Sequence, residues 1–405
     1  MTKYGRSPWL ERVPRTRVPS YPRHRGDLAV DVAIIGGGLT GCATAYAFAA
    51  AGIKVVLVEA GRVGQGGSSA SGGWIADDPG ANFADVEKLI GLRAARHAWR
   101  AWRRAALDFA SLIRRLDVTC DLDARGSLVV SSGPDQTLRL KREQTARREA
   151  GLDASVVSAR AVAAEAAVAA DAAFRSRDGA TLDPYRATLG LAAAAAARGA
   201  TIFEQSPATR TGFDRKWAMV RTGGGTIRAG RIVVATGVPT VLFKSLQRHF
   251  WFKSAFSALT VPVPARIRKQ LGTRRTVIRD LAVPPHTLRW VDDARLLVSG
   301  AATDTPPARL REKALVQRTG QLMYELSTFY PDISGILPEY GWEAPFALTA
   351  EGLPYIGAHR NFPHHRFAFG DASAGVTGAY LASRIFLRDY LGEADAADQA
   401  FSFTR

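Results

Sequence analysis

The feature that most constrains the fold is a glycine-rich turn near the start of the chain. Residues 30–60 read VDVAIIGGGLTGCATAYAFAAAGIKVVLVEA, in which an apolar run at 32–35 leads into a G-x-G-x-x-G motif. This pattern predicts a buried strand, a tight turn, a helix over 39–51 and a second strand over 54–58. Strand, turn, helix and strand in this order form the β-α-β unit of a dinucleotide-binding domain. We therefore predict an α/β fold.

The glycines and one acid of this unit predict a nucleotide site. Gly36 permits the tight turn, Gly38 lets the backbone approach a pyrophosphate, and Gly41 lets the helix pack closely on the strand. Glu59 ends the second strand, where it can hydrogen-bond ribose hydroxyls and would repel a 2′-phosphate. The helix N-terminus can face an anion. The expected contacts are Gly36, Gly38, Leu39, Thr40, Gly41, Glu59 and Ala60.

Two further glycine-rich stretches lie far from the first. The loop 64–73, GQGGSSASGG, is too polar and flexible for a regular element and suits a second loop around phosphates or a ring system. Residues 372–378, ASAGVTG, follow a strand and open a helix that runs to Leu391. This second helix N-terminus can stabilise a negative or electron-rich group, which a simple nicotinamide enzyme would not need.

The organisation of the chain predicts two domains. Over 241–335 aromatic and β-branched residues alternate with polar ones, which predicts an antiparallel sheet closed by a helix over 307–330. Helices over 85–116 and 134–150 flank a strand at 126–130, and the alanine-rich stretch 156–173 reads as a helix. We predict a discontinuous, Rossmann-like nucleotide-binding domain of residues 29–84, 152–240 and 336–405. Residues 85–151 and 241–335 would form an α+β antiparallel-sheet substrate-binding domain, and 1–28 an extended basic arm on the surface.

The net charge of +17 admits nucleic acid, an anionic membrane surface or acidic substrates as partners. The strongest basic run, 93–104, tests these possibilities. An apolar stripe runs along the predicted helix, and arginines occupy its remaining face, which favours a solvated surface over a nucleic-acid site. The stripe consists of Leu89, Leu92, Trp99, Trp102, Ala106, Phe109 and Ile113. No apolar run is long enough to span a bilayer.

The cysteine and histidine content bears on compartment and metals. Cys42 and Cys120 are the only cysteines, and they lie far apart without a C-x-x-C motif. This usage suits a reducing cytoplasm, which we take as the expected location, and it excludes a disulfide framework. The N-terminal residues lack the apolar segment of a secretory signal. No cluster of histidines, cysteines and acids has metal-ligand spacing, so no metal is expected.

Together these motifs resemble the D-amino acid oxidase-like family of FAD-dependent oxidoreductases, the group of the glycine, sarcosine and γ-glutamylputrescine oxidases. The resemblance extends from about Asp27 to Gly392 and rests on VAIIGGGLTG with Glu59, GGSSASGGWI, IVVATG, LRWVDDARLLVSG, TAEGLPYIG and FAFGDASAGVTG. It implies that the discontinuous nucleotide-binding domain is an FAD-binding domain, with Ser68 and Ser69 near the phosphates and the backbone of Ala208 at the adenine. The other implied flavin contacts are Gly72, Gly73, Ala235, Thr236, Gly237, Gly370, Asp371, Gly375, Val376, Thr377 and Gly378.

The resemblance also implies a reaction. A hydride equivalent from the C–H beside an amine nitrogen of a small amine or amino acid would pass to flavin N5, leaving an imine, and O2 or another acceptor would reoxidise the flavin. Amino-acid oxidases clamp the substrate carboxylate with an Arg before the T-x-D-G-x-P-x-x-G loop, but residues 342–346 read WEAPF here. Arg289 is therefore the candidate anion clamp, although an exposed strand Arg fits nearly as well. Trp74 and Tyr355 complete the predicted substrate contacts, and no catalytic base stands out.

Two alternatives and one detail of cofactor binding remain. An NAD-dependent dehydrogenase would need only the first motif, and a basic tRNA-modifying or other RNA-associated flavoprotein could carry the same domain. The expected attachment of FAD is noncovalent. Neither cysteine lies near residues 352–378, the loop 64–73 holds no histidine, and His359, His364 and His365 belong to a turn that we expect to point away from the ring.

Overall fold

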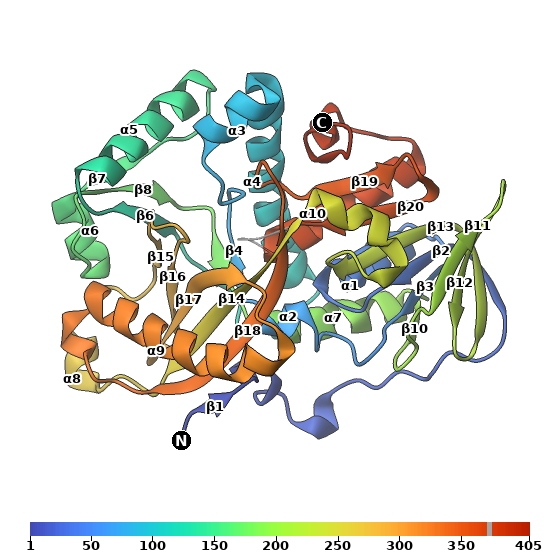
Figure 1. Ribbon diagram of the computed structural model, residues 1–405, viewed down its shortest axis with the longest axis horizontal. Coiled ribbons are helices and arrows are strands. Elements are labelled where there is room, and N and C mark those ends of the chain that lie inside the picture. Colours follow the sequence, from blue (N-terminus) through green and yellow to red (C-terminus); the bar gives the residue numbers. More distant parts are fainter. Residues whose placement is uncertain (371–374) are drawn as a thin grey trace.

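The predicted β-α-β unit forms the centre of an eight-stranded sheet in the computed structural model, which describes residues 1–370 and 375–405 (Figure 1). β2 (Leu28–Ile35) leads into α1 (Leu39–Ala50), and β3 (Val55–Val58) pairs parallel with β2. β10 (Thr201–Phe203), β13 (Gly225–Gly237) and β20 (Phe362–Phe369) continue the parallel set. The carboxyl ends of these strands therefore meet at one edge of the sheet.

Both faces of this sheet are buried, as a parallel sheet requires. Val32 and Ile34 face the core formed by α1, α7 (Pro184–Ala197) and α10 (Gly375–Leu391). Ala33 and Ile35 point to the opposite face, where they join a second core. That core includes residues of η3 (Val241–His249), β12 (Ala218–Thr222) and β19 (Tyr355–His359), and β11 (Arg210–Phe213) pairs antiparallel with β12.

A nine-stranded sheet, largely antiparallel, forms the second half of the molecule (Figure 1). Its strand order is β1 (Lys3–Tyr4), β18 (Pro338–Leu348), β14 (Trp251–Thr260), β17 (Arg295–Asp304), β16 (Thr287–Val291), β15 (Val277–Arg279), β6 (Ser127–Ser131), β8 (Ala172–Ser176) and β7 (Val156–Ser158). The predicted fold class, with its antiparallel sheet, is confirmed.

The two faces of this second sheet have different neighbours. On the outer face Leu296 and Val298 pack beneath α9 (Arg311–Phe329), the helix expected over 307–330. Leu297, between them, belongs to the core that is continuous with α1. The inner face of the nine-stranded sheet is thus turned toward the parallel sheet.

The remaining elements connect or cover these sheets. They are α2 (Gly67–Ala70), β4 (Trp74–Ile75), α3 (Phe83–Ile90), α4 (Leu92–Arg115), β5 (Asp123–Ala124), α5 (Pro134–Glu149), α6 (Ala159–Ala166), β9 (Ala180–Thr181), α8 (Ala265–Arg268) and five short 3-10 helices, η1 (Pro8–Leu10), η2 (Arg15–Arg17), η4 (Ala308–Leu310), η5 (Pro331–Ile333) and η6 (Ala396–Phe401). α2 is a single helical turn inside the loop that we had expected to lack regular structure. Among the helices of residues 1–370 and 375–405, none is long and apolar enough to cross a bilayer.

Two predicted domain boundaries differ from the way in which the chain is divided between the two sheets. Residues 156–176 carry β7 and β8, and residues 338–348 carry β18, so both segments belong to the nine-stranded sheet rather than to the nucleotide half. The predicted helix over 156–173 is only Ala159–Ala166, because Ala167 ends it with a φ of 54° and the apolar residues on either side pair as strands. Alanine content gave no signal of this pairing.

The predicted apolar stripe on the basic helix is correct only in part. Trp99, Trp102, Phe109 and Ile113 are buried, and most arginines of α4 face solvent. Leu89 and Leu92, however, are 62% and 42% exposed. Gly91, with a φ of 83°, separates α3 from α4, so the helical periodicity does not continue across it.

The N-terminal segment is more deeply inserted than a surface arm. β1 pairs with β18 at the edge of the nine-stranded sheet, while Gly26 hydrogen-bonds Gly224 beside the parallel sheet. Trp9 and His24 are 1% and 2% exposed. The segment therefore spans both sheets and forms part of the core.

Candidate cofactor and substrate site

The first glycine motif has the close packing that its spacing predicts. Gly36 has a φ of 110°, and a Cβ there would lie 2.6 Å from the carbonyl oxygen of Ala235 on β13. A Cβ on Gly41 would overlap the carbonyl oxygen of Gly36, so this glycine lets α1 lie directly against the end of β2. Larger side chains at 36 or 41 would thus separate the helix from the strands.

Glu59 and Ser68 line the same turn. The Glu59 carboxylate accepts hydrogen bonds from the amides of Gly37 and Gly61, each at 2.7 Å. The Ser68 hydroxyl accepts one from the Leu39 amide at 2.7 Å, beside Gly38 at the N-terminus of α1. An acid at the ribose position and a helix N-terminus that binds an oxygen atom are the two groups that a dinucleotide needs here.

The loop that follows α2 is fastened through four successive carbonyl groups. The carbonyl oxygens of residues 70–73 accept, in order, from Trp342 Nε1 at 2.9 Å, Trp9 Nε1 at 3.0 Å, Arg289 Nε at 2.6 Å and the Leu182 amide at 2.9 Å. These donors come from β18, the N-terminal segment, β16 and the residue before the N-cap of α7. The backbone of residues 70–73 is therefore held in one position between the two sheets.

Arg289 is a fastener of this loop and not a free anion clamp. Its side chain is only 6% exposed, Nη2 donates to the Leu182 carbonyl at 3.1 Å, and the guanidinium lies 5.1 Å from the Trp9 ring centroid. Burial lowers its pKa to about 9. The predicted clamp is thus wrong in role, because the group that would bind a substrate carboxylate binds backbone carbonyls.

The other predicted flavin contacts surround the carboxyl edge of the parallel sheet. Gly237 and Gly370 have φ values of 74° and 93° at the ends of β13 and β20. In the first turn of α10, Thr377 Oγ1 donates to the Ala76 carbonyl at 2.8 Å and so ties this helix to the chain beyond Trp74. Ala235, Thr236, Gly375, Val376 and Gly378 lie in these same elements, and Gly72, Gly73 and Ser69 lie in the fastened loop or in α2. Thr40 belongs to α1, Ala60 is exposed after β3, Ala208 is half-buried before β11, and Asp371 lies outside the described residues.

The two aromatic substrate candidates lie in different environments. Trp74 is buried in β4, and its Nε1 has no hydrogen-bond partner among the described residues. Tyr355 instead stacks on Phe403 at 4.9 Å, beneath the Arg405 guanidinium at 4.0 Å from its ring centroid. Tyr355 is thus part of the packing of the C-terminal residues, and Trp74 keeps an indole N–H available beside the loop.

Three inner-face groups were missed from the sequence. Ser257 and Ser299 hydrogen-bond each other at 2.8 Å, and Ser299 Oγ lies 3.6 Å from where a Cβ on Gly72 would be. Arg279 follows Val277 by two residues on β15, so both side chains lie on the same face of the sheet. Val277 packs into the inner core, which places Arg279 on the inner face. Strand alternation gave the only signal for these positions, and it could not distinguish the inner from the outer face.

The residues at this edge fit FAD. The glycine cradle, the Glu59 carboxylate and the first turn of α1 suit an adenosine diphosphate, while the fastened loop and α10 extend the site toward the inner face of the nine-stranded sheet. Comparison with known proteins agrees. A model of the FAD dependent oxidoreductase family matches residues 31–387. The chain belongs to this family.

This FAD-dependent oxidoreductase has relatives of similar length. It is 25% identical over 378 residues to a gamma-glutamylputrescine oxidoreductase of Escherichia coli (strain K12), covering 92% of this chain and 86% of that protein. A glycine oxidase of Bacillus licheniformis is 25% identical, with 88% of this chain and 92% of that protein covered. The crystal structure of glycine oxidase from Geobacillus kaustophilus superimposes with a TM-score of 0.74 at 21% identity, covering 93% of this chain and 99% of the other.

Family membership confirms the resemblance predicted from the motifs and identifies the cofactor of this enzyme as FAD. The alternative of an NAD-dependent dehydrogenase that uses only the first motif is thereby set aside.

Proposed function

We propose that this enzyme oxidises a C–N bond of a small amine or amino acid. When bound, FAD supplies the hydride acceptor, which takes the hydride equivalent from the carbon beside the amine nitrogen and leaves an imine. The proposal is supported by the amine-oxidising relatives, gamma-glutamylputrescine oxidoreductase and glycine oxidase. The observation that carries it is the fastened loop 70–73, which joins the nucleotide edge of one sheet to the inner face of the other.

The residues of this chain that would contact FAD are those at the carboxyl edge. Gly38 would leave room for the pyrophosphate, while Gly36 and Gly41 keep the turn and α1 packed closely beneath it. Glu59 would bind the ribose, and the first turn of α10 would face the pyrimidine end of the ring. The backbone of residues 70–73, being held at four carbonyls, would fix the position of the ring against the inner face of the nine-stranded sheet. Binding and orientation are the contributions of the protein to hydride transfer.

We further propose that Arg279 orients an anionic group of the substrate. Its side chain lies deep in the molecule but keeps some exposure, and it has no hydrogen-bond or ion-pair partner among the described residues. Burial lowers the pKa of Arg279, while the charges of Asp78 and Asp280 act in the opposite direction. A deep guanidinium without a partner is suited to a carboxylate. The hydroxyls of Ser257 and Ser299 lie on the same face, in the row of paired residues that runs from Arg279 across β16 and β17 to β14, and offer neutral polar contacts.

We also propose a reducing location such as the cytoplasm. Cys42 and Cys120 are both buried, and neither is paired with the other. Unpaired buried thiols are compatible with a compartment that keeps thiols reduced.

The reaction is tested by mixing the purified holoenzyme anaerobically with candidate amines and following the flavin spectrum. A panel should include glycine, a secondary amino acid, a diamine and an acylated diamine with a terminal carboxylate. We expect one class of amine to bleach the flavin and to yield the carbonyl product of imine hydrolysis. Failure of every amine, with bleaching by a 2-hydroxy acid or a polyol phosphate instead, would contradict the proposal.

The role of Arg279 is tested with Arg279→Met and with Arg266→Met, an exposed arginine on α8, as the control. Loss of a charge-assisted hydrogen bond of about 1.5 to 3 kcal/mol predicts a KM for an anionic amine that rises by roughly tenfold to a hundredfold. Flavin content and kcat should change little. An unchanged KM, or an equal rise for an amine without a carboxylate, would place the anion site elsewhere.

A further inference from the structure

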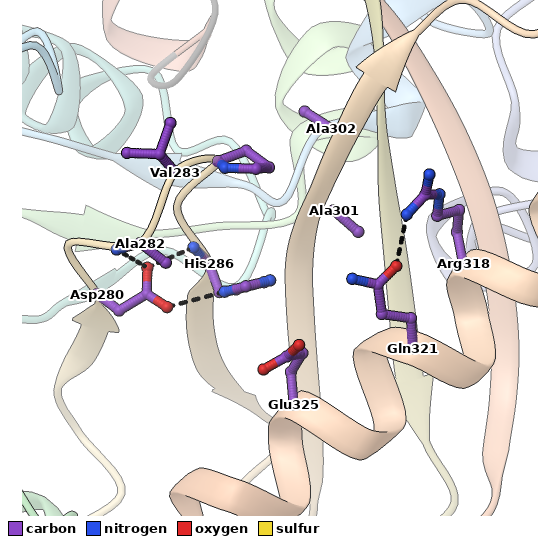
Figure 2. A pocket seen from close by; sticks show the side chains of 10 residues that line it. Asp280, Ala282, Val283, His286, Ala301, Ala302, Arg318, Gln321 and Glu325 are labelled. Carbon is purple, nitrogen blue, oxygen red and sulfur yellow. Dashed lines mark hydrogen bonds and ion pairs between the residues drawn. The ribbon is translucent and has the colours of Figure 1, made fainter. Parts of the chain in front are cut away.

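A cavity of about 300 Å³ lies between α9 and the loop that joins β15 to β16 (Figure 2). Ala301 and Ala302 of β17 form part of its wall. Ala301 belongs to the core beneath α9, together with Leu296 and Val298, so the cavity opens on the outer face of the nine-stranded sheet. Arg289 and Ser299, in contrast, face the loop 70–73 on the inner side. The cavity is therefore separate from the cofactor and substrate site.

His286 is positioned at this cavity by Asp280. Its Nδ1 lies 2.8 Å from Asp280 Oδ2, and its backbone amide donates to Asp280 Oδ1 at 2.7 Å. Nε2 is buried without a hydrogen-bond partner among the described residues, and the residue is only 7% exposed. Because a carboxylate faces Nδ1, that nitrogen carries a proton in either charge state of the ring, and Nε2 is an acceptor when the ring is neutral and a donor when it is protonated. In Figure 2 the ring points into the cavity.

The neighbouring strand is shaped to admit this ring. A Cβ on Gly300 would lie 2.6 Å from Cδ2 of His286, and Gly300 has a φ of 156°. Any larger residue at 300 would push the imidazole away from its place beside Asp280. The position of His286 therefore depends on the strand as well as on the loop that carries it.

α9 forms the opposite wall of the cavity and contributes one basic and one acidic side chain, Arg318 and Glu325. Glu325 points from the helix toward His286, and Arg318 donates through Nη1 to Gln321 Oε1 at 2.6 Å (Figure 2). Burial lowers the pKa of His286, but the hydrogen bond and charge of Asp280, with a contribution from Glu325, raise it overall. Arg318 and Glu325 are separated by seven residues, which places their Cα atoms roughly 10 Å apart along a helix. One end of the cavity is thus acidic and the other basic.

We propose that this cavity binds a small ω-amino carboxylate. Its ammonium group would donate to the Glu325 carboxylate and to Nε2 of the neutral His286 ring, so binding requires that the ring give up its second proton. Its carboxylate would pair with Arg318 beside Gln321. The methylene chain would contact Val283, Pro284 and Ala301, and the separation of the two charges favours an ω-amino over an α-amino acid. Binding here does not depend on the reaction at the flavin.

The test is an equilibrium calorimetric titration of the holoenzyme with 6-aminohexanoate. We expect saturable binding to one site, with hexanoate and hexylamine each at least about tenfold weaker, since each retains only one charged contact. Glu325→Gln and Arg318→Gln should each weaken 6-aminohexanoate by about tenfold or more. Glu312→Gln, an exposed position on the same helix, should bind as wild type. Melting temperatures of the three variants establish that they remain folded.

Three results would overturn the site. The first is equal affinity of wild type and Glu325→Gln for 6-aminohexanoate. The second is equal affinity of wild type for 6-aminohexanoate and for either hexanoate or hexylamine. The third is binding of 6-aminohexanoate that shifts the flavin spectrum and survives both Glu325→Gln and Arg318→Gln. The last would place the ligand at the flavin. A failure of all amines to bleach the flavin would count against the proposed reaction and would leave this titration unaffected.

Discussion

At the scale of single residues, the role of Arg289 shows how burial decides function. A guanidinium on a cavity strand can bind a substrate anion or hold the protein together, and the sequence is the same in both cases. In the structure the Gly72 and Leu182 carbonyls occupy two of its nitrogen atoms, and the Trp9 ring covers it. A charge that is buried in this way must be hydrogen-bonded, because its desolvation is otherwise uncompensated.

This role predicts that Arg289→Met lowers stability and flavin affinity together. The substitution leaves two carbonyl groups without their charged donor, at a cost of about 1.5 to 3 kcal/mol for each hydrogen bond. Thermal unfolding and the dissociation constant of FAD provide the measurements. Arg295→Met, which removes only a partly exposed pair with Glu339 on the same sheet, should cost about 1 kcal/mol or less. A variant with normal flavin content and stability but a raised KM for anionic amines would restore the anion-clamp role.

His365 predicts a specific sensitivity to acid. It is 1% exposed, both ring nitrogens lack hydrogen-bond partners within residues 1–370 and 375–405, and its ring stacks on Phe367 at 6.0 Å. Burial lowers its pKa from 6.5 to about 4. Because the unfolded chain binds the proton more tightly, the free energy of unfolding should fall as pH decreases from 6.5 to 4. The loss should be on the order of 3 kcal/mol.

His365→Phe should remove this part of the acid sensitivity, since phenylalanine fills the same aromatic cluster without titrating. Denaturant unfolding at pH 7 and pH 4 measures the difference, with His364→Asn at the neighbouring, partly exposed position as the control. Equal losses in wild type and His365→Phe would show that His365 is not the responsible group.

At the scale of elements, the N-terminal segment was predicted to be a surface arm, but in the structure it is a structural part of the site. Its β1 pairs with β18, Trp9 donates to the Ser71 carbonyl, and Arg12 forms ion pairs with Asp292 and Asp121. The proline- and arginine-rich composition predicted a surface location correctly for most side chains but could not reveal these anchors. A residue such as Trp9 acquires its role only from a loop more than sixty positions away.

Trp9→Phe should therefore loosen the flavin loop. It keeps an aromatic ring beside Arg289 and removes only the indole donor to Ser71, so stability should fall by about 0.5 to 1.5 kcal/mol. Flavin should also dissociate faster, which the recovery of free FAD fluorescence measures. Trp217→Phe, a partly exposed position on the β12 hairpin, serves as the matched control. Identical flavin release in both variants would contradict a positioning role for Trp9.

At the scale of the whole molecule, noncovalent attachment of FAD stays a prediction, with which both cysteines are consistent. His359 lies in β19 and His364 and His365 lie in β20, not in the turn that we expected. Cys42 is fully buried within α1, and burial raises the pKa of its thiol. Burial likewise raises the pKa of Cys120 to about 12, so neither thiol is a ready nucleophile. We expect acid precipitation to leave the yellow colour in the supernatant. Colour in the pellet would instead indicate a covalent bond, and peptide mapping would locate it.

The sequence by itself determined the elements whose pattern is local. The β-α-β unit, its glycine positions, Glu59, the antiparallel strands over 251–304 and the helix α9 were all predicted, because apolar periodicity and glycine spacing act within some thirty residues. Tertiary structure alone decided which sheet β7, β8 and β18 join, what Arg289 and Trp9 bind, and that His286 meets Glu325 across a cavity. These outcomes depend on pairs of residues brought together across long stretches of chain, and a side chain has no partner until the packing of both sheets supplies one.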